Sequence, residues 1–113
     1  MIGRVKDALK SEGFGVLTEI DVAGTLKTKI GKDFRPYRIL GACNPNLAFE
    51  ALTEEANIGV MLPCNVVVQR AGDGEVEVSS IDPATTMQAV GNPKLSAVAD
   101  KVRAALKRVI EAV

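Results

Sequence analysis

Hydrophobic and polar positions alternate along this chain with two periods, and the change from one period to the other marks the expected elements. Helical spacing of apolar residues predicts one helix over 2–12 and another over 22–30, each followed by a glycine that can end it. Between them, residues 14–20 have the alternation of a strand. The side chains expected to share one face of that strand are Phe14, Val16, Thr18 and Ile20.

The stretch PYRILGACNP, residues 36–45, is the centre of the predicted fold. It predicts a strand over 37–43, and then a helix to about residue 55 that starts with an Asn cap followed by Pro at the first helical position. Alternation places Ile39, Gly41 and Cys43 on one face of the strand and Arg38, Leu40 and Ala42 on the other. A glycine inside a strand often marks close approach by another backbone or a ligand. The predicted buried stripe of the helix is Leu47, Ala48, Ala51 and Leu52.

The longest apolar run, IGVMLPCNVVVQR at 58–70, contains a proline near its middle. Because proline cannot donate to a strand ladder, we expect two strand pieces with a bend at Pro63. Asp73–Gly74 predicts a two-residue hairpin turn, which pairs Arg70 with Glu77 and returns as a strand over 76–82.

Two further polar-then-proline pairs open the last helices. Asp82–Pro83 predicts a short helix to about Val90, and Asn92–Pro93 opens the longest helix of the chain. The apolar stripe of that helix is Leu95, Val98, Ala99, Val102, Leu106, Val109, Ile110 and Val113. Four strands and these helices predict an α+β fold, with a curved antiparallel sheet and helices packed on one face.

Composition narrows the possible functions mainly by exclusion. The 113 residues suit a single domain, and fourteen basic residues balance fourteen acidic ones, which argues against a nucleic-acid partner. No apolar run reaches the roughly 18 residues of a membrane span. Histidine is absent, so Ser-His and Cys-His catalytic pairs and histidine metal sites are excluded. Two cysteines without a leader predict a cytoplasmic protein with reduced thiols.

Four motifs resemble the bacterial and archaeal family known as domain of unknown function 302. They are GFGVLTEIDV at 13–22, PYRILGACNP at 36–45, IGVMLPCNVVV at 58–68 and VEVSSIDP ending at 83. The resemblance implies a domain shaped like the TATA-binding protein fold (strand, helix, four antiparallel strands, helix), and it implies neither DNA binding nor a reaction. Members usually carry a strand before the first helix, and that strand is missing here, either because the start is truncated or because the strand was lost. The free sheet edge that this leaves predicts a homodimer, joined through the sheet or through helix faces.

Two thiols and one arginine are the candidate chemical groups. Cys43 precedes a helix N-terminus, which favours a thiolate, and with Cys64 it could bind Cu(I) or form a reversible disulfide. The alternative is that both cysteines are packing residues. Arg38 could bind a carboxylate or phosphate, or it could pair with a neighbouring acid such as Glu19 or Asp21. The asparagines that follow the two cysteines are expected to satisfy backbone groups.

The sequence therefore predicts a small binding or interaction domain without catalytic residues, cofactor or metal. Its ligand is expected to be a small molecule or a soft metal ion. The predicted ligand-binding residues are Arg38, Gly41, Cys43, Asn44, Pro63, Cys64 and Asn65. The alternatives are a thiol redox or persulfide-handling protein and a Cu(I) carrier, both using the two cysteines.

Overall fold

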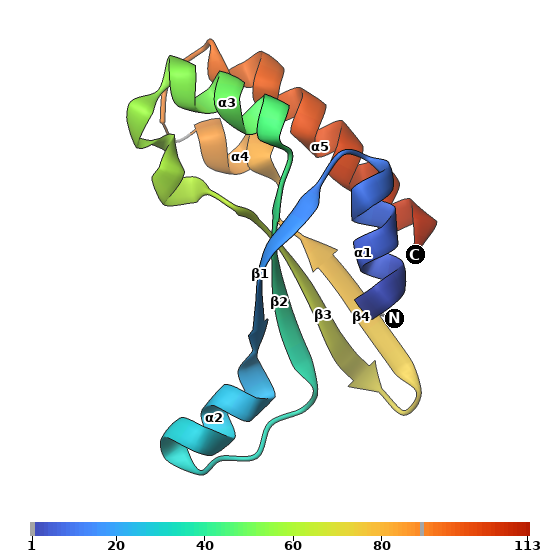
Figure 1. Cartoon of the computed structure of the whole chain (residues 1–113). Coiled ribbons are helices and arrows are strands. Elements are labelled where there is room, and N and C mark those ends of the chain that lie inside the picture. Colours follow the sequence, from blue (N-terminus) through green and yellow to red (C-terminus); the bar gives the residue numbers. More distant parts are fainter. Residues whose placement is uncertain (1, 89) are drawn as a thin grey trace.

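Four antiparallel strands, each hydrogen-bonded to the next one along the chain, form the sheet at the centre of the structure (Figure 1). The structure is a computed structural model and describes residues 2–88 and 90–113. The strands are β1 (Gly15–Asp21), β2 (Tyr37–Cys43), β3 (Cys64–Gly72) and β4 (Glu75–Ser80). Together with the helices, this sheet confirms the predicted α+β fold.

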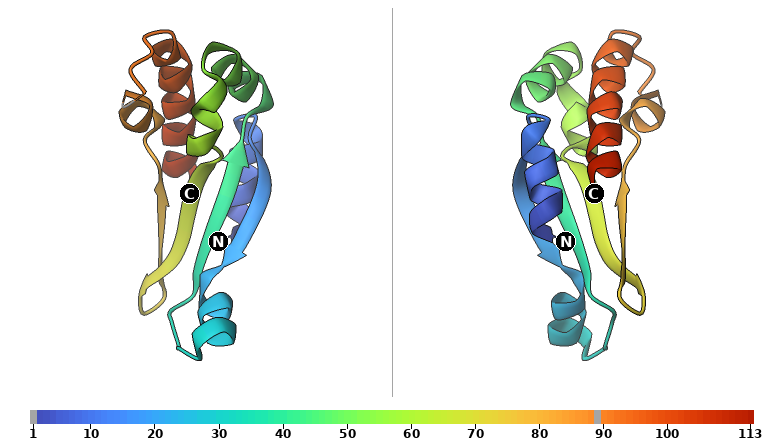
Figure 2. Two further views of the ribbon diagram at one scale, coloured as in Figure 1. Left: turned by 90° about the vertical axis from the view of Figure 1, so that its left-hand side faces the viewer. Right: turned by 90° about the vertical axis from the view of Figure 1, so that its right-hand side faces the viewer.

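The helices leave one face of this sheet uncovered. They are α1 (Ile2–Ser11), α2 (Val22–Ile30), α3 (Pro45–Glu54), the 3-10 helix η1 (Ala56–Met61), α4 (Pro83–Gln88) and α5 (Leu95–Ala112). Figure 2 shows α1 and α5 on one face, which we call the helix-covered face. On the other, which we call the open face, α2 projects at one end of the sheet and α3 with η1 at the other. Among the described residues, no helix is long and apolar enough to cross a membrane.

The core lies between the helix-covered face of the sheet and the helices α1 and α5. Leu40 and Ala42 of β2, which share a face as predicted, and Val66 of β3 are fully buried there. Most of the predicted stripe of α5 is confirmed, although Ile110 and Val113 are only partly buried and Ala105 was not predicted. This helix alone supplies seven buried residues: Leu95, Val98, Ala99, Val102, Ala105, Leu106 and Val109. The same helix is joined to the end of α1 by an ion pair of 2.7 Å between Arg108 Nε and Glu12 Oε1.

A β-bulge in β1 makes the predicted face of that strand wrong. Val16 pairs with Ala42 and Thr18 pairs with Gly41, so one extra residue is inserted between them. Such an insertion shifts the two-residue period and moves every later side chain to the other face. Ile20 therefore lies opposite Ile39 on the open face and is 47% exposed, whereas Phe14 and Val16 face the core.

The first half of the apolar run is a 3-10 helix, so the prediction of two strand pieces is wrong. Residues 56–61 form η1, and β3 begins only after Pro63, which follows a cis peptide bond. A short apolar run cannot by itself distinguish a strand from a buried helical segment. Within η1, Ile58 is buried in the core, whereas Val60 is 88% exposed.

The other predicted boundaries need smaller corrections. A second bulge near the hairpin pairs Gln69 with Glu77 and Arg70 with Val76, so the predicted pairing of Arg70 with Glu77 is wrong by one residue. Leu52 is exposed rather than part of the buried stripe of α3. The predicted end of the short helix near residue 90 adjoins residue 89, which lies outside the described residues.

Candidate functional site

The structure divides the predicted ligand-binding residues between the two faces of the sheet. Arg38 pairs with Asp21 and Val68, and all three belong to the helix-covered face. Gly41 pairs with Thr18 and Asn65, and all three belong to the open face. The side chain of Arg38 therefore lies on the opposite face from Gly41, and the two residues cannot share one ligand site on that face.

Side chains of the chain itself occupy the space next to Gly41. A Cβ atom at this position would lie 2.8 Å from Pro63 Cγ and closer still to Thr18 Oγ1. The close approach predicted from a glycine inside a strand is thus real, and it is made by Thr18 and Pro63. Among the described residues, this leaves no room for a ligand directly on the glycine.

The two asparagines of the predicted site differ in role. Asn44 caps α3, because its Oδ1 accepts a hydrogen bond from the backbone N–H of Leu47 (3.3 Å). Its Nδ2 lies 3.5 Å from the carbonyl oxygen of Glu12, at the end of α1. This confirms its expected backbone role. Asn65 is exposed on the open face, and its backbone carbonyl accepts a hydrogen bond from the N–H of Ile81 (3.2 Å).

The two cysteines are free thiols that line the same small cavity. This cavity has a volume of about 20 Å³ and apolar walls that include Phe14, Leu47 and Val98. A space of this size holds no more than a water molecule. Burial, and to a smaller extent the neighbouring Cys43, raises the pKa of the Cys64 thiol. A raised pKa keeps the thiol protonated and makes it a poor nucleophile.

Arg38 belongs to a cluster of charged side chains that balance one another. Its Nη1 lies 2.6 Å from Glu19 Oε2, and its Nη2 lies 3.8 Å from Asp21 Oδ2. Lys6 of α1 contacts the same Glu19 carboxylate at 2.7 Å. The hydrogen bond from Lys6, followed by that from Arg38, lowers the pKa of Glu19 below its usual value. The structure thus confirms the expected pairing of Arg38 with neighbouring acids.

A groove of about 430 Å³ beside this cluster was not predicted from the sequence. It lies on the helix-covered face next to Ile2, at the N-terminal end of α1, and we call it the Arg70 groove. Its lining includes the apolar residues Ile2, Pro36, Val68 and Val76 and the charged residues Asp21, Arg38 and Arg70. These residues come from distant parts of the chain, and only the pairing of the strands brings them together.

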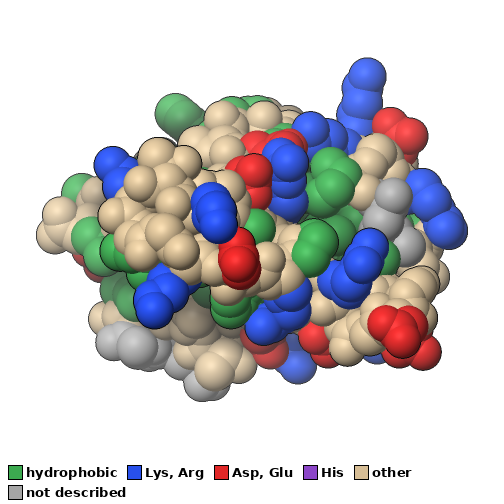
Figure 3. Space-filling view, turned by 90° about the horizontal axis from the view of Figure 1, so that it is seen from below, with side chains coloured by type: hydrophobic (Ala, Val, Ile, Leu, Met, Phe, Trp, Pro, Cys, Tyr) green, Lys and Arg blue, Asp and Glu red, His purple; other side chains and the backbone are tan. Residues whose placement is uncertain are grey.

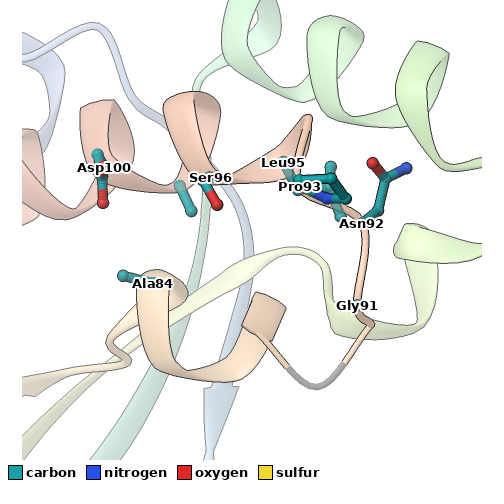
Figure 4. A pocket seen from close by; sticks show the side chains of 8 residues that line it. Ala84, Gly91, Asn92, Pro93, Leu95, Ser96 and Asp100 are labelled. Carbon is teal, nitrogen blue, oxygen red and sulfur yellow. The ribbon is translucent and has the colours of Figure 1, made fainter.

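Two other hollows lie toward the opposite end of the molecule. A groove of about 390 Å³ beside η1, which we call the η1 groove, is lined by Val60, Met61, Pro63, Asn65 and Ile81 among others. A third hollow, of about 410 Å³, lies between α4 and the start of α5 (Figure 4). There the Asn92 amide is already used, because it donates to the Glu54 carbonyl oxygen (3.1 Å) and accepts from the Lys94 N–H (3.0 Å).

No metal centre is formed by the part of the chain that the structure describes. Within residues 2–88 and 90–113, no three or more Cys, Asp or Glu side chains gather as metal ligands. A site made by the two cysteines alone stays a prediction.

Comparison with known proteins identifies the family but no activity. The family model described as "Domain of unknown function DUF302" matches residues 1–113. The crystal structure of an uncharacterized conserved DUF302 protein from Bacillus stearothermophilus is similar, with a TM-score of 0.90 and 33% sequence identity. The match covers 98% of this chain and 86% of that one. No curated protein matches the chain. On the full-length family match and the likeness to this structure, the chain belongs to the DUF302 family, a family of unknown function.

Proposed function

We propose that the protein is a non-enzymatic interaction domain that works in the cytoplasm as a homodimer, in which two chains meet through the open faces of their sheets. The observation that carries this proposal is an apolar surface on that face. Two free thiols suit the reducing cytoplasm. No constellation of catalytic groups competes with this interpretation among the described residues.

The apolar surface is a row of side chains that crosses three strands. Ile20, Ile39 and Val67 lie directly opposite one another on β1, β2 and β3. None of the described helices covers this row (Figure 2). An antiparallel sheet with one face toward water normally carries polar side chains on that face. A continuous apolar row on such a face is typical of a surface that contacts another protein.

Further exposed apolar side chains occur elsewhere on β1 and on η1. Leu17, the residue inserted at the bulge of β1, is 66% exposed. Toward η1, Asn65 of the open face also lines the η1 groove, where Val60 is 88% exposed. The row and the groove together offer a surface on which a second protein can bury apolar side chains.

Charge complementarity favours a second copy of this chain as the partner. Segment 22–36, which includes α2, carries Lys27, Lys29, Lys32 and Arg35 against a single acid, Asp33. Segment 45–61, which includes α3 and η1, carries Glu50, Glu54 and Glu55 and no basic residue. These segments project at opposite ends of the open face (Figure 2).

The two charged segments also select the arrangement of the dimer. When the two-fold axis lies between the sheets and perpendicular to the strands, the basic segment of each chain meets the acidic segment of the other. This contact then occurs twice, once at each end of the dimer. An axis parallel to the strands would instead bring like charges together, which is unfavourable. Glu50 lies 3.9 Å from Lys101 of α5 and Glu54 lies 3.7 Å from Lys94, just before α5, and both contacts are long for ion pairs.

Sedimentation equilibrium tests the proposed dimer with two matched variants. Ile20→Lys places a charge in the apolar row and is expected to give a monomer. Val76→Lys makes the same kind of change at a similarly exposed residue (43%) of the helix-covered face, and this variant is expected to remain a dimer. A monomeric wild-type protein, or equal dissociation of the two variants, would overturn the proposal.

A charge exchange tests the arrangement separately. Lys29→Glu and Glu54→Lys are each expected to weaken the dimer, and the double variant is expected to restore it, because the two positions then exchange signs. Raising the salt concentration should weaken the wild-type dimer through screening. If Ile20→Lys abolishes the dimer but the Lys29→Glu, Glu54→Lys double variant does not restore it, the open face remains the dimer contact. The antiparallel arrangement is then refuted.

A further inference from the structure

We infer that the Arg70 groove binds a small organic monoanion, with one carboxylate or sulfonate head and an apolar body. This groove lies on the face opposite the apolar row and shares only Ala23, Gly24 and Pro36 with segment 22–36 of the proposed dimer contact, so the inference does not rest on the proposed function. Three features of the groove support this: its position, its apolar walls and the charge balance of its three ionised side chains.

The position of the groove follows from the short length of α1. This helix covers only part of its face of the sheet, and the lower part of the strands extends beyond the helix (Figure 2, right). Ile2 marks the rim of the groove on the α1 side, and Pro36 and Val76 belong to its walls. Its volume of about 430 Å³ lies within the range of small-molecule sites, about 300–1,000 Å³. Seen from this end, hydrophobic side chains lie between Lys and Arg side chains (Figure 3).

The walls of the groove are suited to an apolar body. Val68 is buried at the level of the sheet, and Val76 of β4 is partly exposed beside it. Ile2 and Pro36 contribute apolar surface from α1 and from the segment before β2. A ligand that covers these residues removes apolar surface from water, which is the main source of affinity in such sites.

The charge balance of the groove calls for one negative charge. Arg38 is already neutralised by Glu19 and Asp21. The Asp21 carboxylate also accepts the N–H of Gly24 (3.0 Å) as the cap of α2, so it too is occupied. Arg70, by contrast, forms no ion pair with any residue in the described parts of the chain. Its planar guanidinium can donate two parallel hydrogen bonds to a carboxylate or sulfonate.

One uncompensated arginine distinguishes between classes of anion. A nucleotide or another polyphosphate needs several cations or a helix N-terminus for its charges. The Arg70 groove offers a single free guanidinium beside an occupied carboxylate. It therefore suits a monoanion, and an uncharged ligand of the same shape would leave the guanidinium without a partner.

A fluorescent anion with an aromatic body, 1-anilinonaphthalene-8-sulfonate, is the first probe. Titration of the full-length protein with this probe is expected to give saturable binding, which octanoate displaces and octanol at the same concentration does not. Arg70→Gln should weaken binding on the order of tenfold, the effect of losing a hydrogen-bonded charged partner. Arg103→Gln is the matched control, because Arg103 is exposed on α5 and lies 3.5 Å from Asp82.

Nuclear magnetic resonance then locates the bound probe. Side-chain methyl shifts are expected at Val68 and Val76, which line the groove, and not at Ile20 or Val67 of the open face. Equal affinity of the Arg70→Gln and Arg103→Gln variants would overturn the inference. Shifts confined to the open face would also overturn it, because the probe would then report the apolar row. Both substitutions change exposed side chains, and circular dichroism verifies that each variant is folded.

Discussion

Replacing Gly41 with alanine is expected to destabilise the protein, although the change adds a single methyl group. The new Cβ would lie 2.8 Å from Pro63 Cγ and closer still to Thr18 Oγ1, distances that folded proteins do not tolerate without movement. Neither neighbour moves easily. Pro63 is a rigid ring, and the β-branched Thr18 has few side-chain rotamers on a strand.

The expected loss of stability is about 1–2 kcal/mol. Overpacking by one methyl group in a well-packed region costs about 1–3 kcal/mol. Alanine also restricts the unfolded chain more than glycine does, which returns about 0.4–1 kcal/mol. For a domain of this size, a net loss of about 1–2 kcal/mol lowers the Tm by about 4–8 °C.

Differential scanning calorimetry and urea unfolding measure this loss, and Gly15→Ala is the control. Gly15 also lies in a strand, but a Cβ there meets no atom within 4 Å, so this variant should be as stable as the wild type or slightly more stable. Adding Thr18→Ala to Gly41→Ala should recover part of the loss, and the double-mutant cycle gives the coupling between the two positions. If Gly41→Ala unfolds at the same temperature as Gly15→Ala, the steric argument is refuted.

Three further predictions concern the cysteines and the cap of α3. In the native protein, iodoacetamide should modify the partly exposed Cys43 before the buried Cys64, and mass spectrometry that found the reverse order would contradict the described burial. Because burial raises the pKa of Cys64, its thiol ionises first in the unfolded chain. The free energy of unfolding should therefore fall as the pH rises above about 9, and pH-dependent urea unfolding should show a smaller fall for Cys64→Ala. Asn44→Ala should cost about 1 kcal/mol in urea unfolding through loss of the helix cap, and an unchanged midpoint would argue against that role.

Local devices made much of the fold predictable from the sequence. Asn44–Pro45 begins a helix where expected, and the apolar stripe of the last helix identifies its buried face. The helix cap and the helical spacing both depend on residues that are close together in the sequence, so they can be recognised without knowing the tertiary structure. The errors in strand pairing arise where an extra residue enters a strand. The bulge after Val16 and the bulge near Arg70 leave the local pattern unchanged but shift the pairing of the strands.

The candidate sites were harder to predict because they depend on strand pairing. Simple alternation already placed Arg38 and Gly41 on opposite faces of β2, which argued against a shared site. The Arg70 groove combines Ile2 with Val76, two residues far apart in the sequence, and the register between β3 and β4 helps to place them around one hollow. The apolar row on the open face depends on the β1 bulge, without which Ile20 would face the core.

The position of α5 has a consequence for synthesis of the protein. All four strands are neighbours in sequence order, so the sheet can form progressively while the chain is being made. The helix that supplies seven buried residues comes last, and its 18 residues take about 1–4 s to add at usual rates of translation. During that time, the face that α5 will later cover stays exposed to water and to chaperones. A nascent chain that stalls before residue 95 would therefore present one uncovered face and a second face that α1 covers only in part, the form of this protein most prone to aggregation.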